Sequence, residues 1–391
     1  MIDYKKVINQ NVLNIPTSGI RKYFDLAAGM DEVISLGVGE PDFLTPWHIR
    51  QAGIKAIEEG ATRYTDNLGL VELRQAIADY LKRRFDLTYQ AKTEIMVTIG
   101  GSEAIDLALR ILISADDEIL IPEPCYVCYN PITSVSNGVV VPIETSKTDN
   151  FKLTPELLKQ KITTKTKLLI ISYPNNPTGA IMEKEDLEAI APILIENNIF
   201  VISDEIYAEL NYTDRVHFSI ANIPGMAERT IVVGGFSKTY SMTGWRLGYA
   251  CGPSALINEL IKIHQYAIMS APTMSQYAGI EALNAGDEDI ARVKEEYNMR
   301  RRFITDGFNR LGLMCFEPKG AFYVFPCIKS TNMTSDEFCE RLLSSQHVAV
   351  VPGNAFGASG EGYIRVSYCY SIKHIKEALL RIEQFIKTQS L

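Results

Sequence analysis

Short apolar runs alternate with helical periodicity over residues 90 to 250. The runs that predict strands are 94–99, 118–121, 139–142, 168–171, 200–203 and 231–233. Two of the intervening segments, 102–112 and 186–197, space apolar residues three and four apart, which is typical of one face of a helix. Strands that alternate with helices favour a mostly parallel central sheet covered by helices. The predicted fold class is therefore α/β.

The pattern changes after about residue 285. A charge-rich helical stretch, 289–310, is expected to be a long solvated helix. Beyond it lie three predicted strands and a closing helix: 320–325, 348–351, 363–368 and 373–386. We therefore expect a smaller α+β domain. The predicted division is an N-terminal segment, 1–45, that contributes to the small domain, a large domain, 46–285, and a C-terminal small domain, 286–391.

Composition narrows the class of protein. The chain has 391 residues, 46% of them hydrophobic, which is enough for a large core in two domains. A net charge of −8 disfavours a surface for nucleic acid or anionic membranes. No apolar run approaches about 18 residues, and the first residues lack the apolar core of a secretory signal, so neither a membrane span nor secretion is expected.

The cysteines indicate a reducing compartment. Seven scattered cysteines suit free thiols, so a cytoplasmic location is expected. Cys125 and Cys128 form a C-x-x-C pair, but no second pair or nearby histidine completes a metal-binding set. Neither zinc nor redox chemistry is expected there, and Cys369 is expected to pack in the core.

Polar residues gather just after two of the predicted strands. Ser172–Gly179 follows 168–171, and Ser203–Tyr207 follows the next apolar run. In open α/β sheets, ligands bind beyond the carboxyl ends of the strands. A buried carboxylate there, Asp204, can keep the ring nitrogen of pyridoxal phosphate (PLP) protonated, while an amide N–H and a phenol O–H can donate to the ring's phenolate oxygen. The alternatives are a helix N-cap at Asp204 and a simple turn at Asn176-Pro177.

Lys238 lies in a turn of small residues, Gly234–Arg246. A lysine amine forms a Schiff base with the aldehyde of PLP, and an arginine such as Arg246 can hold the cofactor's phosphate through its planar fork. A single lysine is more often a solvated surface charge. Its coincidence with the polar residues at the strand ends favours the cofactor.

These motifs together resemble the PLP-dependent class I aminotransferases, which share the fold of aspartate aminotransferase. The resemblance rests on Asn176–Gly179, on Ser203–Tyr207, and on Ser237-Lys238 with Gly244–Arg246 downstream. Further motifs extend it from Gly39–Phe43 to Tyr363–Tyr368, which is nearly the whole chain. The most similar branch includes bacterial aromatic and N-acetyl-diaminopimelate aminotransferases.

For the cofactor, the resemblance implies one set of residues that contacts the ring and another that contacts the phosphate. Asn176, Asp204, Tyr207 and Lys238 would hold the ring and its aldehyde, and Tyr126 would stack on the ring. Gly101 and Ser102, at a helix start, would bind the phosphate with Arg246. Glu103 must then point away from the phosphate. In aspartate aminotransferases a serine three residues before the lysine helps hold the phosphate; here Gly235 stands there, and Ser237 is the candidate substitute.

For the substrate and the assembly, the resemblance implies three more residues. Arg365 would bind the α-carboxylate, the alternative being a surface salt bridge. Gly39 would let that carboxylate approach the backbone, although it could be a simple turn. Tyr64 matches a tyrosine that reaches the phosphate of the partner subunit, which implies a homodimer with shared sites.

The implied activity is transfer of an α-amino group to a 2-oxo acid, most plausibly 2-oxoglutarate, in a ping-pong cycle with Lys238 as general base. The donor is left open among aromatic amino acids, aspartate and N-acetyl-diaminopimelate; Arg21 is a candidate for a second carboxylate. One alternative is a carbon–sulfur β-lyase of the same fold. Another is a PLP-sensing regulator, which would need a DNA-binding domain, whereas only about 35 residues precede Gly39 and they are not notably basic.

Overall fold

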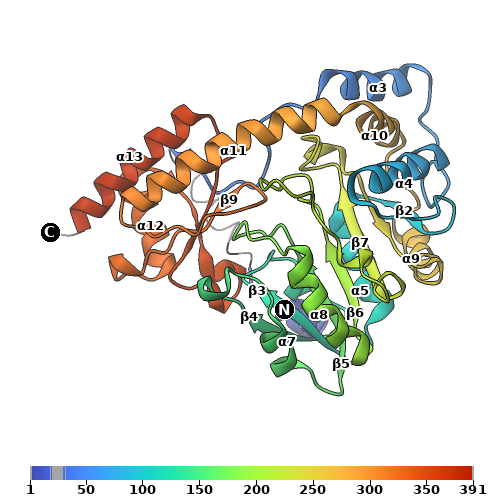
Figure 1. The fold of residues 1–391 in the computed structure, drawn as a ribbon, viewed down its shortest axis with the longest axis horizontal. Helices are drawn as coiled ribbons and strands as arrows, with labels where there is room; N and C mark the ends of the chain where they lie inside the picture. Colours follow the sequence, from blue (N-terminus) through green and yellow to red (C-terminus); the bar gives the residue numbers. More distant parts are fainter. Residues whose placement is uncertain (1, 18, 20–29, 31, 390–391) are drawn as a thin grey trace.

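The computed structural model describes residues 2–17, 19, 30 and 32–389, so the candidate Arg21 lies outside the described residues. Its centre is a seven-stranded sheet in the order β2-β8-β7-β6-β5-β3-β4 (Figure 1). The strands are β2 (Ile95–Thr98), β3 (Glu118–Glu123), β4 (Val139–Glu144), β5 (Thr166–Ser172), β6 (Phe200–Asp204), β7 (Thr230–Gly235) and β8 (Gly248–Cys251). Pairing from β4 through β7 is parallel, which confirms the predicted sheet.

Strand β8 is the exception, because it runs antiparallel to both β2 and β7. The sequence analysis did not identify it, since Gly248-Tyr249-Ala250-Cys251 is short and carries none of the β-branched residues that mark a strand. The first residue of β8, Gly248, is a glycine for a steric reason. A Cβ at Gly248 would lie 2.5 Å from the carbonyl carbon of Gly100, so only glycine lets β8 pass this close to the helix start beside β2.

Helices cover both faces of the sheet. Ile170, Ile202 and Val233 pack toward α5 (Gly100–Leu112) and α9 (Ser254–Ala267). Their neighbours Leu169 and Val201 pack toward α7 (Pro155–Lys161) and α8 (Lys184–Glu196). This alternation is the period of two expected for strands buried on both faces. The remaining helices of this part are α3 (Trp47–Glu58), α4 (Val71–Phe85), α6 (Tyr129–Val135) and α10 (Thr273–Ala285).

The second part of the chain forms a smaller α+β body. Its elements are α11 (Asp287–Arg310), β9 (Tyr323–Val324), α12 (Ser335–Gln346), β10 (Val348–Ala349), β11 (Val351–Pro352), β12 (Ile364–Ser367) and α13 (Ile372–Gln389). The N-terminal strand β1 (Ile34–Ser35) pairs in parallel with β10, whereas α1 (Gln10–Leu13) bonds to the large body through Asn11 and Asn137. The division at residues 45 and 285 stays a prediction.

Helix α11 spans both bodies, as Figure 1 shows. Ile290 near its start belongs to the core of the large body, while Val293, Tyr297, Ile304 and Phe308 belong to that of the small one. The expectation of a solvated helix is therefore wrong for one face, because the apolar residues hidden among its charges recur at helical spacing. Arg300 on this helix donates to both oxygens of Asp42 at 2.8 Å and so ties the segment after Gly39 to α11.

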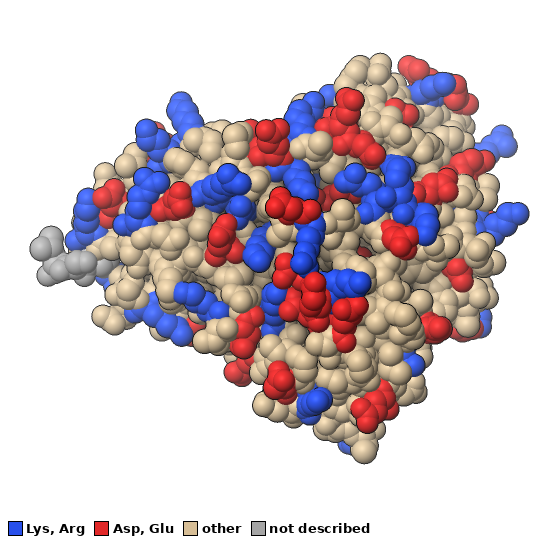
Figure 2. Space-filling view, in the orientation of Figure 1, with Lys and Arg blue, Asp and Glu red and all other residues tan. Residues whose placement is uncertain are grey.

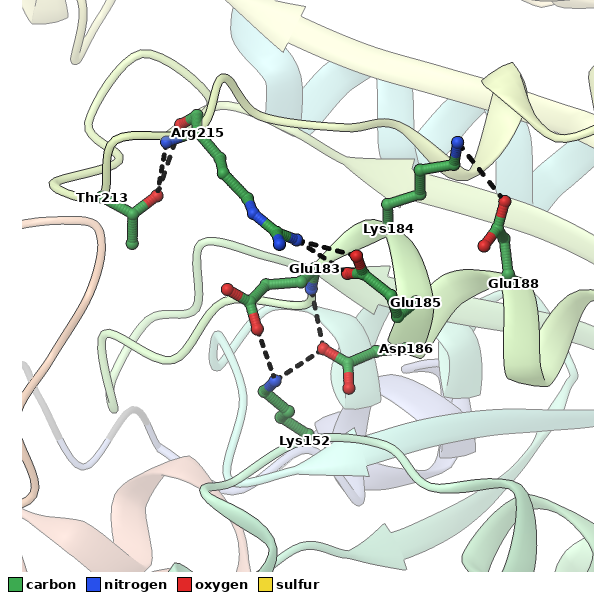
Figure 3. A network of polar contacts seen from close by, with 8 residues as sticks. All are labelled: Lys152, Glu183, Lys184, Glu185, Asp186, Glu188, Thr213 and Arg215. Carbon is green, nitrogen blue, oxygen red and sulfur yellow. Dashed lines mark hydrogen bonds and ion pairs between the residues drawn. The ribbon is translucent and has the colours of Figure 1, made fainter.

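Charged side chains are mixed on the face shown in Figure 2, with acidic groups gathered over the start of α8. Figure 3 shows why that gathering is stable. Lys152 Nζ lies 2.6 Å from Asp186, Arg215 pairs with Glu185 at 2.9 Å, and the N–H of Glu183 donates to Asp186. Carboxylates at a helix N-terminus also interact favourably with its dipole. None of the described helices has the length and apolar character to cross a membrane.

Candidate active site

A cavity of about 300 Å³ lies at the carboxyl ends of β5, β6 and β7, where the two bodies meet. It brings together eleven of the twelve predicted site residues: Gly39, Gly101, Ser102, Tyr126, Asn176, Asp204, Tyr207, Ser237, Lys238, Arg246 and Arg365. Ile105, Tyr129, Ser172, Ile206, Thr243 and Tyr323 complete its lining. Tyr64 is absent from this lining.

Lys238 follows β7 and turns its amine into the cavity. Nζ donates to the carbonyl of Gly39 at 2.7 Å. Burial lowers the pKa of this amine to about 8; Arg365 and Arg246 act in the same direction, and Cys369 and Glu40 oppose them. About a tenth of the amine is therefore uncharged at pH 7, far more than for a solvated lysine, and this is the form that can act as nucleophile or base.

Asp204 is the last residue of β6, and its side chain is buried. Oδ2 accepts a hydrogen bond from the Tyr129 hydroxyl at 2.7 Å, and Oδ1 accepts one from the N–H of Ile206 at 3.2 Å. Burial raises the pKa of this carboxyl, while those two donors and the charge of Lys238 pull it down. The site thus holds an aspartate whose ionised form is supported by donors on both oxygens.

The turn at the start of α5 forms one end of the cavity. Gly100 has φ +74°, which favours glycine, and a Cβ there would lie 2.8 Å from a terminal nitrogen of Arg246, so a side chain would also displace that guanidinium from the turn. The side chain of the N-cap residue, Ile99, caps none of the helix N–H groups, which leaves those of Gly101 and Ser102 for an anion. Together with Arg246 they form a cradle that suits a phosphate.

The structure explains why glycine, and not the serine of aspartate aminotransferases, stands at position 235. A Cβ at Gly235 would lie 2.7 Å from Cδ1 of Ile206, so Ile206 occupies the space that a side chain would need. Ser237 lines the cavity in its place and is buried.

Arg365 forms the opposite end of the cavity from β12. It donates to Oδ1 of Asn176 at 3.1 Å and to the carbonyl of Gly37 at 2.5 Å. Its guanidinium lies between the rings of Tyr323 and Phe356, at 4.6 Å and 4.7 Å from their centroids. Nε is buried and has no hydrogen-bond partner in the described structure. A buried guanidinium with an unused donor is prepared for an acceptor from outside.

Two tyrosines connect the ends of the cavity. The hydroxyls of Tyr207 and Tyr323 lie 2.9 Å apart, and burial raises the pKa of both phenols, so both stay protonated donors at neutral pH. A Cβ at Gly39 would lie 2.3 Å from the Tyr323 hydroxyl. Gly39 is therefore a glycine because the tyrosine passes over it.

Tyr126 and Tyr64 differ in their surroundings. Tyr126 is half-buried in the cavity wall, which Ser102 also lines, and packs edge-on against Tyr129. Tyr64 is 79% exposed within one chain. Cys125 and Cys128 are free thiols, Cys369 is buried, and the described residues contain no group of three potential metal ligands.

Sequence reasoning missed Tyr129 and Tyr323. Tyr129 lies at the start of α6, three residues after Tyr126, so the two share one side of a helical turn and face the same cavity. That spacing was the available signal. Tyr323 lies in the predicted strand 320–325, where alternation alone could not say which face borders the site.

The fold and the cavity together define a class of enzyme, the PLP-dependent aminotransferases with the aspartate aminotransferase fold. The chain belongs to the family described as aminotransferase class I and II, whose model matches residues 31–382. The carbon–sulfur lyase alternative gains no support from these comparisons.

Three similar proteins illustrate the family. A putative aminotransferase of Bacillus subtilis, YugH, is 49% identical over 97% of this chain and 98% of its own length. A probable N-acetyl-LL-diaminopimelate aminotransferase of the same organism is 43% identical, over 97% and 96%. The crystal structure of an aromatic aminotransferase from Pyrococcus horikoshii OT3 superposes with a TM-score of 0.90 at 43% identity, covering 95% of this chain and 99% of that one. These matches confirm the branch that the motifs indicated.

Proposed function

We propose that this aminotransferase moves the α-amino group of an amino acid to 2-oxoglutarate in a ping-pong cycle. The observation that carries the proposal is the meeting of Lys238, Asp204 and Arg365 in one cavity between the two bodies. A lysine nucleophile, a buried carboxylate and a buried guanidinium supply the three functions that the reaction needs.

The residues of the large body fit PLP. Gly101, Ser102 and Arg246, with Ser237 and Tyr126 beside them, would hold the phosphate and the ring. Asp204 would pair with the ring nitrogen, and Tyr207 and Asn176 would donate to the phenolate oxygen. When bound, the cofactor supplies an aldehyde for the amine and a ring that accepts electrons.

Arg365 would bind the α-carboxylate of the substrate. Its unpartnered Nε offers a donor, and the two flanking rings fix the plane of the guanidinium. The amide of Asn176 gives its oxygen to Arg365, which directs its nitrogen toward the ligands. A carboxylate held in this plane fixes the direction of the Cα–H bond.

Lys238 would move the proton. The lowered pKa leaves about a tenth of the amine uncharged at pH 7, far more than a solvated lysine would have, and this uncharged form can act as a base. Nζ would take the proton from Cα of the bound amino acid and hold it for return on the cofactor side of the cavity. The buried walls around Nζ exclude water from this transfer.

The class of amino-acid donor is inferred from the residues that line the cavity. In the described part of the cavity the cations are Lys238, Arg246 and Arg365, and each has a role above. Among the tyrosines of the lining, Tyr323 is the one without a cofactor or Asp204 role above, and its ring lies beside Arg365, where an aromatic donor would pack against it. A second carboxylate, as in aspartate or 2-oxoglutarate, would need a cation such as Arg21.

The active form would be a homodimer. Tyr64 is exposed, as are several large apolar residues of the helices and turns around it: Trp47, Ile54, Ile57, Val71, Tyr266, Ile268, Met269 and Tyr277. An exposed apolar set of this size is typical of an interface. Burying it between two copies would let Tyr64 reach the partner's phosphate cradle. Seven free thiols further support a cytoplasmic enzyme.

A panel of amino acids and 2-oxo acids tests the activity. The purified protein, loaded with PLP, should form glutamate from 2-oxoglutarate with at least one donor, and Lys238→Ala should lose about 10⁴-fold or more in turnover. Borohydride reduction should fix the cofactor on Lys238. Formation of pyruvate and ammonia from a cysteine conjugate without any 2-oxo acid would instead support the lyase.

A further inference from the structure

Glu103 follows the phosphate cradle directly, yet its carboxylate is turned away from the cavity. Oε2 accepts the backbone N–H of Ile99 at 2.5 Å, and Oε1 lies 2.7 Å from Nδ1 of His264. Its side chain is 11% exposed. The carboxylate therefore reaches back across the first turn of α5 instead of capping the N–H groups that the cradle offers.

His264 is the partner that holds Glu103 in this position. It lies near the end of α9, and its side chain is fully buried. A carboxylate only accepts hydrogen bonds, so Nδ1 must carry a proton. Nε2 is buried without a partner in the described structure. A buried polar atom without a partner is costly. The hydrogen bond from Nδ1 to Glu103 is therefore the interaction that offsets the burial of this ring in the described structure.

The two peptides that flank Ile99 are each held. Glu103 accepts from the Ile99 N–H, in the peptide after Thr98, and a terminal nitrogen of Arg246 lies 3.5 Å from the Ile99 carbonyl oxygen, in the peptide before Gly100. The next peptide is held by Thr98, whose hydroxyl donates to the carbonyl of Gly100 at 3.0 Å. The Gly101 N–H belongs to the peptide that Thr98 holds, and the two peptides that flank Ile99 lead the chain into it. The contact of the pair Glu103–His264 with the Ile99 N–H therefore helps to fix the turn from which the Gly101 and Ser102 N–H groups point.

Charge gives the pair a second consequence. An ionised Glu103 released from His264 could turn to its own helix N–H groups, which would fill the cradle and place a negative charge beside a phosphate dianion. The contact with His264 keeps that charge on the far side of the turn.

We propose that Glu103 and His264 are positioning residues that keep the α5 turn open and correctly shaped for a phosphate monoester. The inference rests on the proposed function, because it assumes that Gly101 and Ser102 bind the cofactor's phosphate. It makes α9, which takes no part in the chemistry, a support of cofactor retention.

The test compares affinities of the apoenzyme for PLP and for pyridoxal, which lacks the phosphate. His264→Leu should weaken PLP binding about tenfold or more, the loss expected for a hydrogen bond to a charged group, and change pyridoxal binding by less than about threefold. His264→Asn, whose amide nitrogen can replace Nδ1–H, should restore most of the difference. Protection of the apoenzyme against heat by inorganic phosphate should fall in parallel.

Two controls separate this role from general destabilisation. His217 is a second buried histidine, 3.0 Å from Glu205. His217→Leu should lower the melting temperature without changing the ratio of the two affinities. Glu103→Ala should lose PLP selectively, as His264→Leu does; a gain in PLP affinity on removal of this charge would overturn the positioning role.

Ser102→Ala distinguishes the two levels of the argument. If Ser102→Ala lowers the PLP-to-pyridoxal ratio and the His264 and Glu103 variants do not, the positioning role is wrong and the phosphate cradle stands. If none of these variants changes the ratio, the proposed phosphate site itself is wrong.

Discussion

The two ends of the cavity are built in different ways. The cofactor end comes from short motifs that follow strands of one sheet, with glycines and backbone N–H groups around the exposed Arg246. The carboxylate end is assembled from distant parts of the chain: Arg365 on β12, Asn176 after β5, and the backbone of Gly37. The first end is local in sequence, whereas the second exists only when the two bodies and the N-terminal segment meet.

The two arginines show what this difference costs. Arg246 keeps solvent contact and donates to the carbonyl of Thr243 at 3.1 Å. Arg365 is buried, and burial lowers the pKa of its guanidinium. A buried cation with an unused N–H is costly without an anion beside it, which supports the proposed role of Arg365 in binding a carboxylate. We therefore expect that a substitution at one end of the cavity leaves binding at the other end unchanged.

Asp204→Asn should have the largest effect, and it tests whether the carboxylate at the cofactor end stabilises charge on the cofactor ring. An amide cannot stabilise a charge on the ring nitrogen, so turnover should fall by about 10³-fold. The measurement is kcat, with circular dichroism to show that the fold is kept. A rate within a few-fold of the native enzyme would make Asp204 a structural cap of the strand end and remove the distinction between the two ends.

Exchanging each arginine for lysine should separate the ends. Lysine keeps the charge and loses the bidentate fork. Arg365→Lys should lower kcat/KM by about 10²-fold, largely through KM, with the affinity for PLP unchanged. Arg246→Lys should weaken PLP by about tenfold and leave the KM for the amino acid unchanged once the cofactor saturates.

The crossed pattern is the decisive result for this pair. If Arg365→Lys released PLP, or if Arg246→Lys raised KM at saturating cofactor, the two ends would be coupled and the comparison would be wrong.

The amine of Lys238 lies between the ends, and its pKa sharpens the comparison. Below a pKa of about 8 the amine is mainly protonated, so the rate at which the apoenzyme takes up PLP should rise about tenfold per pH unit and level off above pH 8. A solvated lysine would keep gaining rate to about pH 10.4. Absorbance in stopped flow measures this profile; continued increase past pH 9 would contradict the effect of burial.

Tyr64→Phe should have the smallest effect and tests whether the cofactor end is complete within one chain. Loss of the hydroxyl should weaken PLP retention by about tenfold in the dimer. Mixed with inactive Lys238→Ala subunits, it should give dimers with one site that carries both defects and one that carries neither. These dimers should regain native affinity at that site and about half the native turnover. A fully active monomer would exclude shared sites.

The contrast between local motifs and distant segments also explains which parts of the site the sequence predicted. Asp204, Asn176 and Lys238 were predictable because parallel strands deliver their carboxyl ends to one edge. Strand β8 was not, since its glycine and alanine serve close packing and carry no strand signal. The buried face of α11 was hidden because Tyr297 and Phe308 are dispersed among charges. Tyr323 and Phe356, which flank Arg365, come from separate segments, and no local pattern brings them together.

Helix α11 is shared by two hydrophobic cores. Its 24 residues begin in one core and continue in the other, so a rotation of the small body about the Ile290 end would carry the rest of the helix with it. From Ile290 to Arg310 the rise is about 30 Å, and a tilt of about 5° moves the far end by about 3 Å. Arg300, halfway along, carries Asp42 with it. A small rotation at one end of the helix would therefore be sufficient to change the width of the cavity between the two bodies.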